Sequence, residues 1–159
     1  MESLIYGPTN PGNLGTIIRS AVALGVKKIW VYDIHGLLER RSRSSCEIKR
    51  ASMGACSLVE TSPINNSSLL QKFFEEYNGR KITTVCDNED SIDLPHFICQ
   101  ENDLVLFGNE RYGLPKDIVE REDFQRLRIP MQKSINSLNL SCAFTIIAYE
   151  YMKQNRIII

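Results

Sequence analysis

The sequence predicts one α/β domain, spanning residues 1–159, in which helices flank a mostly parallel β-sheet. Short runs of apolar and β-branched residues alternate with longer segments whose apolar residues recur every three or four positions. This alternation is typical of β-α-β units, which place helices on the faces of a parallel sheet. Neither an internal repeat nor a linker-like segment divides the chain, so we expect a single domain.

The first part of the chain predicts three strands separated by helices. The turn from Gly7 to Gly12 contains two prolines, and Gly25 suits the left-handed conformation that ends many helices. The third helix would turn four apolar residues inward, namely Leu69, Leu70, Phe73 and Phe74. The expected strands are 3–6, 28–32 and 57–60, the expected helices are 13–24, 46–53 and 66–77, and a solvated loop is expected at 40–45.

The second part predicts three more strands and a long final helix. A strand through Leu127 and Ile129 ends at Pro130, which has no N–H to donate to a ladder. Small hydrogen-bonding residues then favour a helix start. The other expected elements are strands at 81–86 and 103–107 and a short helix from about Lys116. The helix-start residues are Ser137, Asn139 and Ser141, and the apolar face comprises Leu140, Phe144, Ile147 and Tyr151.

The composition, 43% hydrophobic and 24% charged, is that of an ordinary globular protein. Since no signal-like or membrane-spanning apolar run is present, we expect a cytoplasmic protein without a membrane partner. The 19 basic and 19 acidic residues cancel, which excludes a global field that attracts polyanions. The most basic window, 39–50, is either a solvated face or a local nucleic-acid contact. Its cationic residues are Arg40, Arg41, Arg43, Lys49 and Arg50.

The five cysteines indicate neither a disulfide framework nor a metal centre. They form no Cys-x-x-Cys pair, and the chain has only two histidines. The ligand spacing of a zinc site is therefore absent. We expect no disulfide, no bound metal and buried, reduced thiols at Cys46, Cys56, Cys86, Cys99 and Cys142.

Three loops with unusual chemistry are expected at the carboxyl ends of strands, where ligands bind in open parallel sheets, namely 7–13, 108–114 and 130–139. The first loop has the glycine spacing of a P-loop. However, Asn13 and Leu14 stand where Lys and Ser or Thr would hold phosphate and magnesium. The same turn offers Gly12 and Gly15 but lacks the Gly-x-Gly of a dinucleotide-binding fold. Both of these nucleotide-binding interpretations therefore fail.

Together, the three loops resemble the motifs of the SPOUT superfamily of knotted methyltransferases, in its SpoU–TrmH branch of RNA ribose 2′-O-methyltransferases. Residues 10–19, NPGNLGTIIR, match a first motif, Asn-x-Gly-Asn-x-Gly-x-x-x-Arg. Residues 104–114, LVLFGNERYGL, match the second motif, and 129–131 with 137–141 match the third. Residues 50–55, RASMGA, are also similar to a segment common in the family. The resemblance extends from Asn10 to about Tyr149.

The resemblance implies a SPOUT fold, whose C-terminal part threads a loop into a deep trefoil knot that cradles S-adenosyl-L-methionine. Sequence pattern alone would not predict a knot, because knots are nearly absent from proteins. An apolar slot would take the adenine, and a strand end would complete the pocket. The cofactor-binding residues implied are Val85, Cys86, Gly108, Ile129, Met131, Ser137 and Leu138.

The catalytic residues implied by the resemblance are Arg19, Asn13, Glu110, Ser137 and Asn139. Arg19 would act at the ribose 2′-hydroxyl, either as a general base or as a clamp on an RNA phosphate that polarises the hydroxyl. The clamp is easier to defend, since the pKa of arginine lies above about 12. Glu110 is open to three roles, as a turn carboxylate, as an orienter of Arg19 or Asn13, or as a base. Asn13 would also cap its helix.

By the same resemblance, the chain is a minimal catalytic domain without an appended RNA-binding domain, similar to short methyltransferases of the tRNA wobble nucleotide. We expect tRNA or rRNA as substrate and a homodimer that builds its sites from both protomers. The basic window 39–50 is the candidate RNA contact. Two alternatives stay open: an inactive RNA-binding protein of the same fold, and a methyltransferase for another acceptor.

Overall fold

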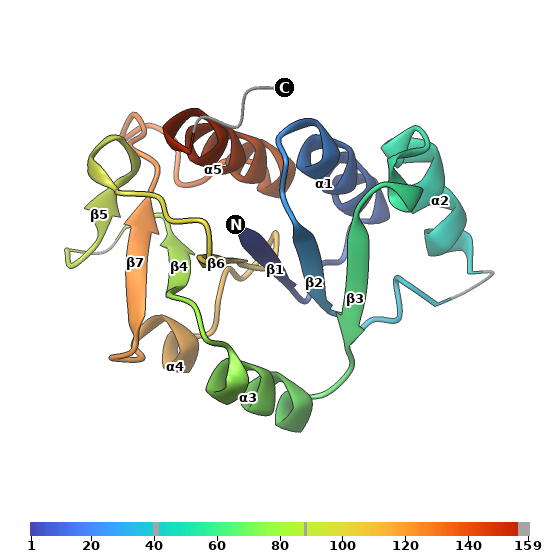
Figure 1. Ribbon diagram of the computed structural model, residues 1–159, viewed down its shortest axis with the longest axis horizontal. Coiled ribbons are helices and arrows are strands. Elements are labelled where there is room, and N and C mark those ends of the chain that lie inside the picture. Colours follow the sequence, from blue (N-terminus) through green and yellow to red (C-terminus); the bar gives the residue numbers. More distant parts are fainter. Residues whose placement is uncertain (40–41, 88, 156–159) are drawn as a thin grey trace.

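The computed structural model describes residues 1–39, 42–87 and 89–155, in which a parallel sheet forms the middle of three layers (Figure 1). Seven strands lie within these residues, namely β1 (Glu2–Tyr6), β2 (Lys28–Tyr32), β3 (Glu60–Ile64), β4 (Lys81–Val85), β5 (Ile92–Asp93), β6 (Leu104–Phe107) and β7 (Phe124–Arg128). Their order is β3-β2-β1-β6-β4-β7-β5, and every pair is parallel. The expected mostly parallel α/β fold is confirmed.

Helices cover both faces of this sheet. The α-helices of the described residues are α1 (Pro11–Ala23), α2 (Arg43–Ser52), α3 (Ser67–Glu76), α4 (Lys116–Val119) and α5 (Leu140–Gln154), with 3₁₀ turns η1 (Ala55–Ser57) and η2 (Leu94–His96). Helices α1, α2 and α5 lie on one face, and α3 and α4 lie on the other (Figure 1). Strands covered on both faces are expected to be apolar throughout, and every residue of β6 is buried.

The final helix packs against the sheet through the face that its spacing predicts. The apolar residues Leu140, Phe144, Ile147 and Tyr151 are all buried. The ring centroid of Phe144 lies 5.2 Å from that of Phe107 on β6. Helix α5 also contacts α1, where the Thr145 hydroxyl donates to the Ser20 hydroxyl over 3.0 Å. The start of α5 is thereby fixed next to α1.

The first helix begins two residues before the expected position because a different asparagine caps it. The side chain of Asn10 accepts a hydrogen bond from the Asn13 backbone N–H over 3.1 Å. Pro11 then occupies the first turn, where its missing N–H costs nothing. The expectation that Asn13 caps this helix is therefore wrong. The side chain of Asn13 is left available for other contacts.

Two more boundaries differ for local reasons. Helix α2 begins within the expected loop 40–45, because the Ser42 side chain accepts from the Ser45 N–H and caps it. The third strand begins at Glu60 rather than at 57, since η1 extends to Ser57. Strand β5 has only two residues, too few to show a period in the sequence.

Two expectations about burial are wrong. Leu69 is 50% exposed, because the buried face of α3 runs through Leu70 and Phe74. All five cysteines are free thiols, but only Cys99 is fully buried. Cys56 is half-buried, and the exposed ones are Cys46, Cys86 and Cys142.

A buried carboxylate fixes the end of the sheet opposite the three loops. Asp103 accepts two hydrogen bonds from the Arg80 guanidinium, each of 2.7 Å, and one of 2.6 Å from the Tyr151 hydroxyl. Burial, followed by the Asp103 contact, raises the pKa of Tyr151, so this hydroxyl stays protonated. Because Arg80 and Asp103 immediately precede β4 and β6, the cluster ties α5 to the starts of two central strands.

None of the helices described is long and apolar enough to cross a membrane. In the same residues, no group of three or more His, Cys, Asp or Glu side chains is arranged to hold a metal ion. The trefoil knot stays a prediction, because strand order and pairing do not establish how one loop passes another.

Candidate active site

The three loops expected at strand ends follow β1, β6 and β7, and all leave the same edge of the sheet. The first two are joined by hydrogen bonds between Thr9 and Glu110, and the first and third by one between Asn13 and Asn139. Residues more than 90 positions apart in the chain therefore share one polar cluster.

Glu110 is the centre of this polar cluster. Its carboxylate accepts hydrogen bonds from the Thr9 N–H (3.0 Å), the Thr9 hydroxyl (3.1 Å), the Asn10 N–H (3.2 Å) and the Asn13 side chain (3.3 Å). Burial raises the pKa of Glu110, but the hydrogen bonds from Thr9, Asn13 and Asn10 outweigh it, so the pKa lies below its usual range. Glu110 is therefore a carboxylate at neutral pH.

Asn13 links Glu110 to the start of the final helix. Its side-chain Nδ2 donates to Glu110, and its Oδ1 accepts from Asn139 Nδ2 over 3.2 Å. The Asn139 Oδ1 accepts from the backbone N–H and the hydroxyl of Ser141, and so caps α5. The amide of Asn13 is thus held from both sides. We define Glu110, Asn13 and Asn139 as the polar network.

Two motif glycines have steric roles. A Cβ at Gly15 would lie 2.6 Å from the Ala51 Cβ and 2.7 Å from the Ile48 carbonyl oxygen, so glycine lets α1 pack closely on α2. A Cβ at Gly108 would lie 2.4 Å from the backbone carbon of Gly113. Gly108 therefore permits the close approach of its own loop, and the cofactor contact expected at Gly108 stays a prediction.

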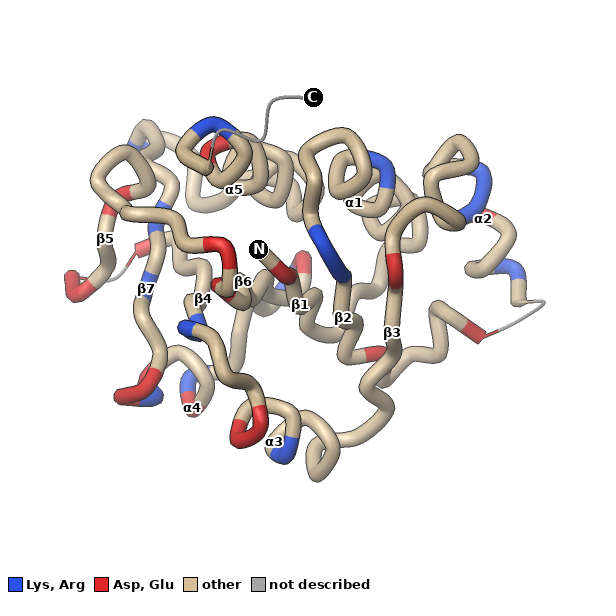
Figure 2. The backbone as a smooth tube through the Cα atoms, viewed as in Figure 1, with Lys and Arg blue, Asp and Glu red and all other residues tan. Residues whose placement is uncertain are grey.

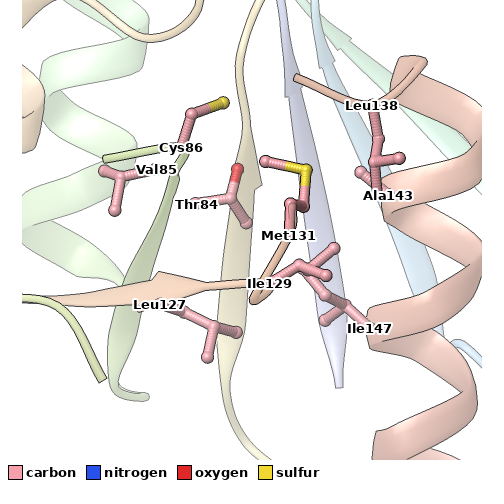
Figure 3. A pocket seen from close by; sticks show the side chains of 9 residues that line it. All are labelled: Thr84, Val85, Cys86, Leu127, Ile129, Met131, Leu138, Ala143 and Ile147. Carbon is pink, nitrogen blue, oxygen red and sulfur yellow. The ribbon is translucent and has the colours of Figure 1, made fainter. Parts of the chain in front are cut away.

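An apolar cavity lies between the ends of β4 and β7 and helix α5 (Figure 3). Five of the predicted cofactor residues line it, namely Val85, Cys86, Ile129, Met131 and Leu138. Gly108 and Ser137 do not line it. Four residues without a predicted cofactor role also line the cavity, namely Thr84, Leu127, Ala143 and Ile147. Of these, Ile147 carried a signal, because it belongs to the predicted apolar face of the final helix.

The cavity and the polar network are adjacent. Leu138 lines the cavity, and the next residue, Asn139, bonds to Asn13. Ser137, which was predicted both as a catalytic and as a cofactor-binding residue, is exposed and has no hydrogen-bond partner among the described residues. The third loop therefore contributes an apolar and a polar side chain from consecutive positions.

Arg19 is not brought into this cluster within one chain. It is exposed on α1 and is not among the residues that line the apolar cavity. In the basic window, Arg43, Lys49 and Arg50 are exposed on α2, which packs on α1 (Figure 2). Arg40 and Arg41 lie outside the described residues. The described cations of the window thus lie on a helix that packs against the helix of Arg19.

The sequence model of the SpoU rRNA methylase family matches residues 3–149. The chain is 42% identical over 159 residues to a putative tRNA (cytidine(34)-2′-O)-methyltransferase of Mycoplasma genitalium, covering 96% of this chain and 90% of that protein. It is 30% identical over 145 residues to an uncharacterized tRNA/rRNA methyltransferase of Synechocystis sp., covering 91% of this chain. It spans 50% of the length of that relative.

Solved structures share the fold. A structure described as giving insights into the 2-OH methylation of C/U34 on tRNA has a TM-score of 0.82 and 28% identity, covering 98% of this chain and 90% of that chain. An AdoMet-bound rRNA methyltransferase from Sinorhizobium meliloti has a TM-score of 0.79 and 27% identity, covering 96% of this chain and 55% of that chain. Since the family match extends over nearly the whole sequence, the chain belongs to the SpoU rRNA methylase family.

Proposed function

We propose that the chain transfers a methyl group from S-adenosyl-L-methionine to the ribose 2′-hydroxyl of a nucleotide in tRNA or rRNA. The observation that carries this proposal is the adjacency of Leu138, in the apolar cavity, and Asn139, in the polar network. The apolar cavity and the polar network are thus adjacent, at the edge of the sheet where parallel α/β folds bind ligands. Membership of the SpoU rRNA methylase family supports the reaction.

The cavity suits the adenine end of the cofactor. Ile129, Met131 and Leu138 offer apolar walls for a flat base, and the strand end at Val85 and Cys86 brings backbone donors and acceptors close. When bound, the cofactor supplies an activated methyl group on a sulfonium, so the protein mainly has to align the attacking oxygen. The AdoMet-bound relative from S. meliloti supports this choice of cofactor.

We assign Arg19 to the RNA. Its guanidinium would bind a phosphate and polarise the 2′-hydroxyl. Glu110 is a weak base because its pKa is lowered, and among the described residues its carboxylate bonds to Asn13 rather than to Arg19. Glu110 would therefore position Asn13, and Asn13 and Asn139 would orient the ribose. Ser137 stays a predicted contact to the cofactor.

We also propose that the active unit is a homodimer. Arg19 lies outside the cavity of its own chain, so a second protomer would have to bring its arginine to the cofactor. Mixing inactive Arg19→Ala with Ala143→Phe, which fills the cavity, should restore up to about a quarter of wild-type activity, because half the dimers are mixed and each has one intact site. If dimers that exchange subunits recover no activity, Arg19 and the cofactor cavity act within one protomer.

Among RNA substrates, we propose the wobble nucleotide of tRNA. The relative from M. genitalium, 90% of whose length is covered, is named for cytidine 34 of tRNA. The exposed cations Arg43, Lys49 and Arg50 would neutralise phosphates. The affinity for tRNA should then fall steeply with salt, and replacing all three by glutamine should flatten that dependence.

The deciding experiment is to incubate the protein with total RNA and methyl-labelled cofactor, followed by nuclease digestion and mass spectrometry. We expect a 2′-O-methyl group at nucleotide 34, with transfer reduced by at least about 100-fold in Arg19→Ala. Lys72→Ala, which changes an exposed cation on α3, should transfer normally. A methyl group on a base or a protein would overturn the proposal. Binding of RNA without transfer would favour an inactive RNA-binding protein.

A further inference from the structure

A second cavity, of about 590 Å³, lies on the other side of the polar network. It is lined by residues that follow β1, β2 and β6, whereas the apolar cavity lies at β4 and β7. Its volume is in the range of about 300–1,000 Å³ that is usual for ligand pockets. Resting on the proposed function, we propose that this cavity binds a nucleobase of the RNA substrate adjacent to the nucleotide that is methylated.

The rim of this second cavity presents an aromatic ring next to a cation. Tyr112 is 80% exposed, and the Arg111 guanidinium carbon lies 5.9 Å from its ring centroid. His35 contributes a second exposed aromatic ring, an imidazole. Nucleobases stack on aromatic rings and on guanidinium planes, whereas phosphates bind the cation. The pair therefore has the chemistry that recognises single-stranded RNA.

The turn that carries Tyr112 and Arg111 is fixed by hydrogen bonds. The Asn109 Oδ1 accepts from the backbone N–H groups of Arg111 (2.8 Å) and Tyr112 (3.1 Å). The Asn109 Nδ2 donates to the Gly7 carbonyl oxygen over 2.6 Å, and so ties the turn to the loop after β1. Because the backbone is already ordered, stacking a base on Tyr112 would cost little conformational entropy.

The cavity is continuous with the polar network through Thr9. Thr9 lines the cavity, and both its N–H and its hydroxyl donate to Glu110. A base in this second cavity would therefore lie next to Thr9, which bonds to Glu110, and Glu110 in turn accepts from Asn13. Because the second cavity is continuous with the polar network, we expect its occupant to be a nucleotide next to the one that is methylated, rather than a separate ligand.

The wall of the cavity also offers a hydrogen-bonding group. The ring centroid of Tyr6 lies 4.8 Å from that of Tyr32, and the Tyr6 hydroxyl has no hydrogen-bond partner among the described residues. Burial, with Tyr32 and Asp117 nearby, raises the pKa of Tyr6, so the phenol stays a donor at neutral pH. It would supply an edge contact to a base that stacks on Tyr112.

The test measures the binding of an anticodon stem-loop RNA to the full chain by fluorescence anisotropy. Tyr112→Ala should weaken binding roughly 10-fold, since one base loses its stacking partner, and Tyr112→Phe should stay within about twofold of wild type. Ile98→Ala, which removes another strongly exposed side chain, should bind as wild type does. The affinity for S-adenosyl-L-methionine alone should be the same in all four proteins.

A second arm identifies the base. Abasic substitutions on either side of the methylated nucleotide should include one that weakens wild-type binding roughly 10-fold but does not weaken Tyr112→Ala further. The inference would be refuted if the abasic substitutions weakened RNA binding equally in both proteins, or if Tyr112→Ala bound RNA as tightly as the wild type. Neither result would affect methylation by the wild type. A Tyr112→Ala chain that changes its oligomeric state would show a subunit contact instead. A wild type that binds no RNA would overturn the proposed function as well.

Discussion

Asn139 donates a hydrogen bond to Asn13 over 3.2 Å, although 126 positions separate the two residues. The contact joins the cap of α5 to the first turn of α1. Because Asn13 also donates to Glu110, one amide holds together loops that leave three different strands. Substitution of Asn13 therefore tests the polar network.

Asn13→Ala should lower both stability and activity. The substitution removes hydrogen bonds to Glu110 and Asn139, each worth about 1 kcal/mol, so the melting temperature should fall by roughly 4–8 °C. Methyl transfer should fall at least about 10-fold at a temperature where the variant is folded. Thr16→Ala, an exposed change one turn along the same helix, is the control and should alter neither quantity much. Wild-type activity in Asn13→Ala would remove it from the mechanism.

Glu110→Gln should change how stability depends on pH. A carboxylate whose folded-state pKa is lowered stabilises the fold above its unfolded pKa, and this contribution is lost as the pH falls through the folded pKa. The variant should therefore be less stable than the wild type at pH 7, and the difference should shrink as the pH falls below the ordinary value of 4.5. Urea unfolding at several pH values measures it. Glu122→Gln, an exposed control, should follow the wild type throughout.

Ala143→Phe should block the cofactor without unfolding the protein. Ala143 lines the apolar cavity, so a phenyl ring there would fill the space that the adenine needs. Calorimetric titration should show S-adenosyl-L-methionine bound at least about 10-fold more weakly. Cys142→Phe adds the same ring one position earlier, on an exposed side of α5, and should bind normally. Equal affinities in the two variants would place the cofactor elsewhere.

Asp103→Ala should destabilise the fold without touching the chemistry. The substitution removes the carboxylate that accepts from the Arg80 guanidinium, which is 28% exposed, and from the Tyr151 hydroxyl. Removing one partner of such a pair costs about 3–5 kcal/mol, and Tyr151→Phe, which keeps the ion pair, should cost about 1 kcal/mol. Denaturant unfolding compares the two. Methyl transfer per folded molecule should match the wild type in both, because the cluster lies at the opposite end of the sheet.

The sequence predicted the elements whose signals are local. The face of α5 follows from the spacing of Leu140, Phe144 and Ile147, and the loops follow from apolar runs that stop at glycine or proline. The capping of α1 was assigned to the wrong asparagine, since Asn10 and Asn13 both precede apolar residues and only the backbone decides between them.

The contacts between the site residues depend on tertiary structure, so local sequence signals could not predict them. Glu110 meets Thr9 only because β6 pairs with β1, and nothing near either residue encodes that pairing. The cavity residues Thr84 and Ala143 are ordinary in their own segments and gain a role only when β4 and α5 converge. The family resemblance supplied the identities of Asn13, Glu110 and Asn139, and the structure supplies how they touch.

The place of β1 at the middle of the sheet affects how the protein is made. One edge of β1 pairs with β2, whose residues are synthesised soon afterwards, but the other pairs with β6, starting from Glu2 opposite Leu104. During translation the backbone groups of that second edge have no strand partner until β6 has left the ribosome. Unpaired strand edges of this kind are templates for pairing with another chain, so the nascent chain carries an aggregation-prone edge until β6 is made.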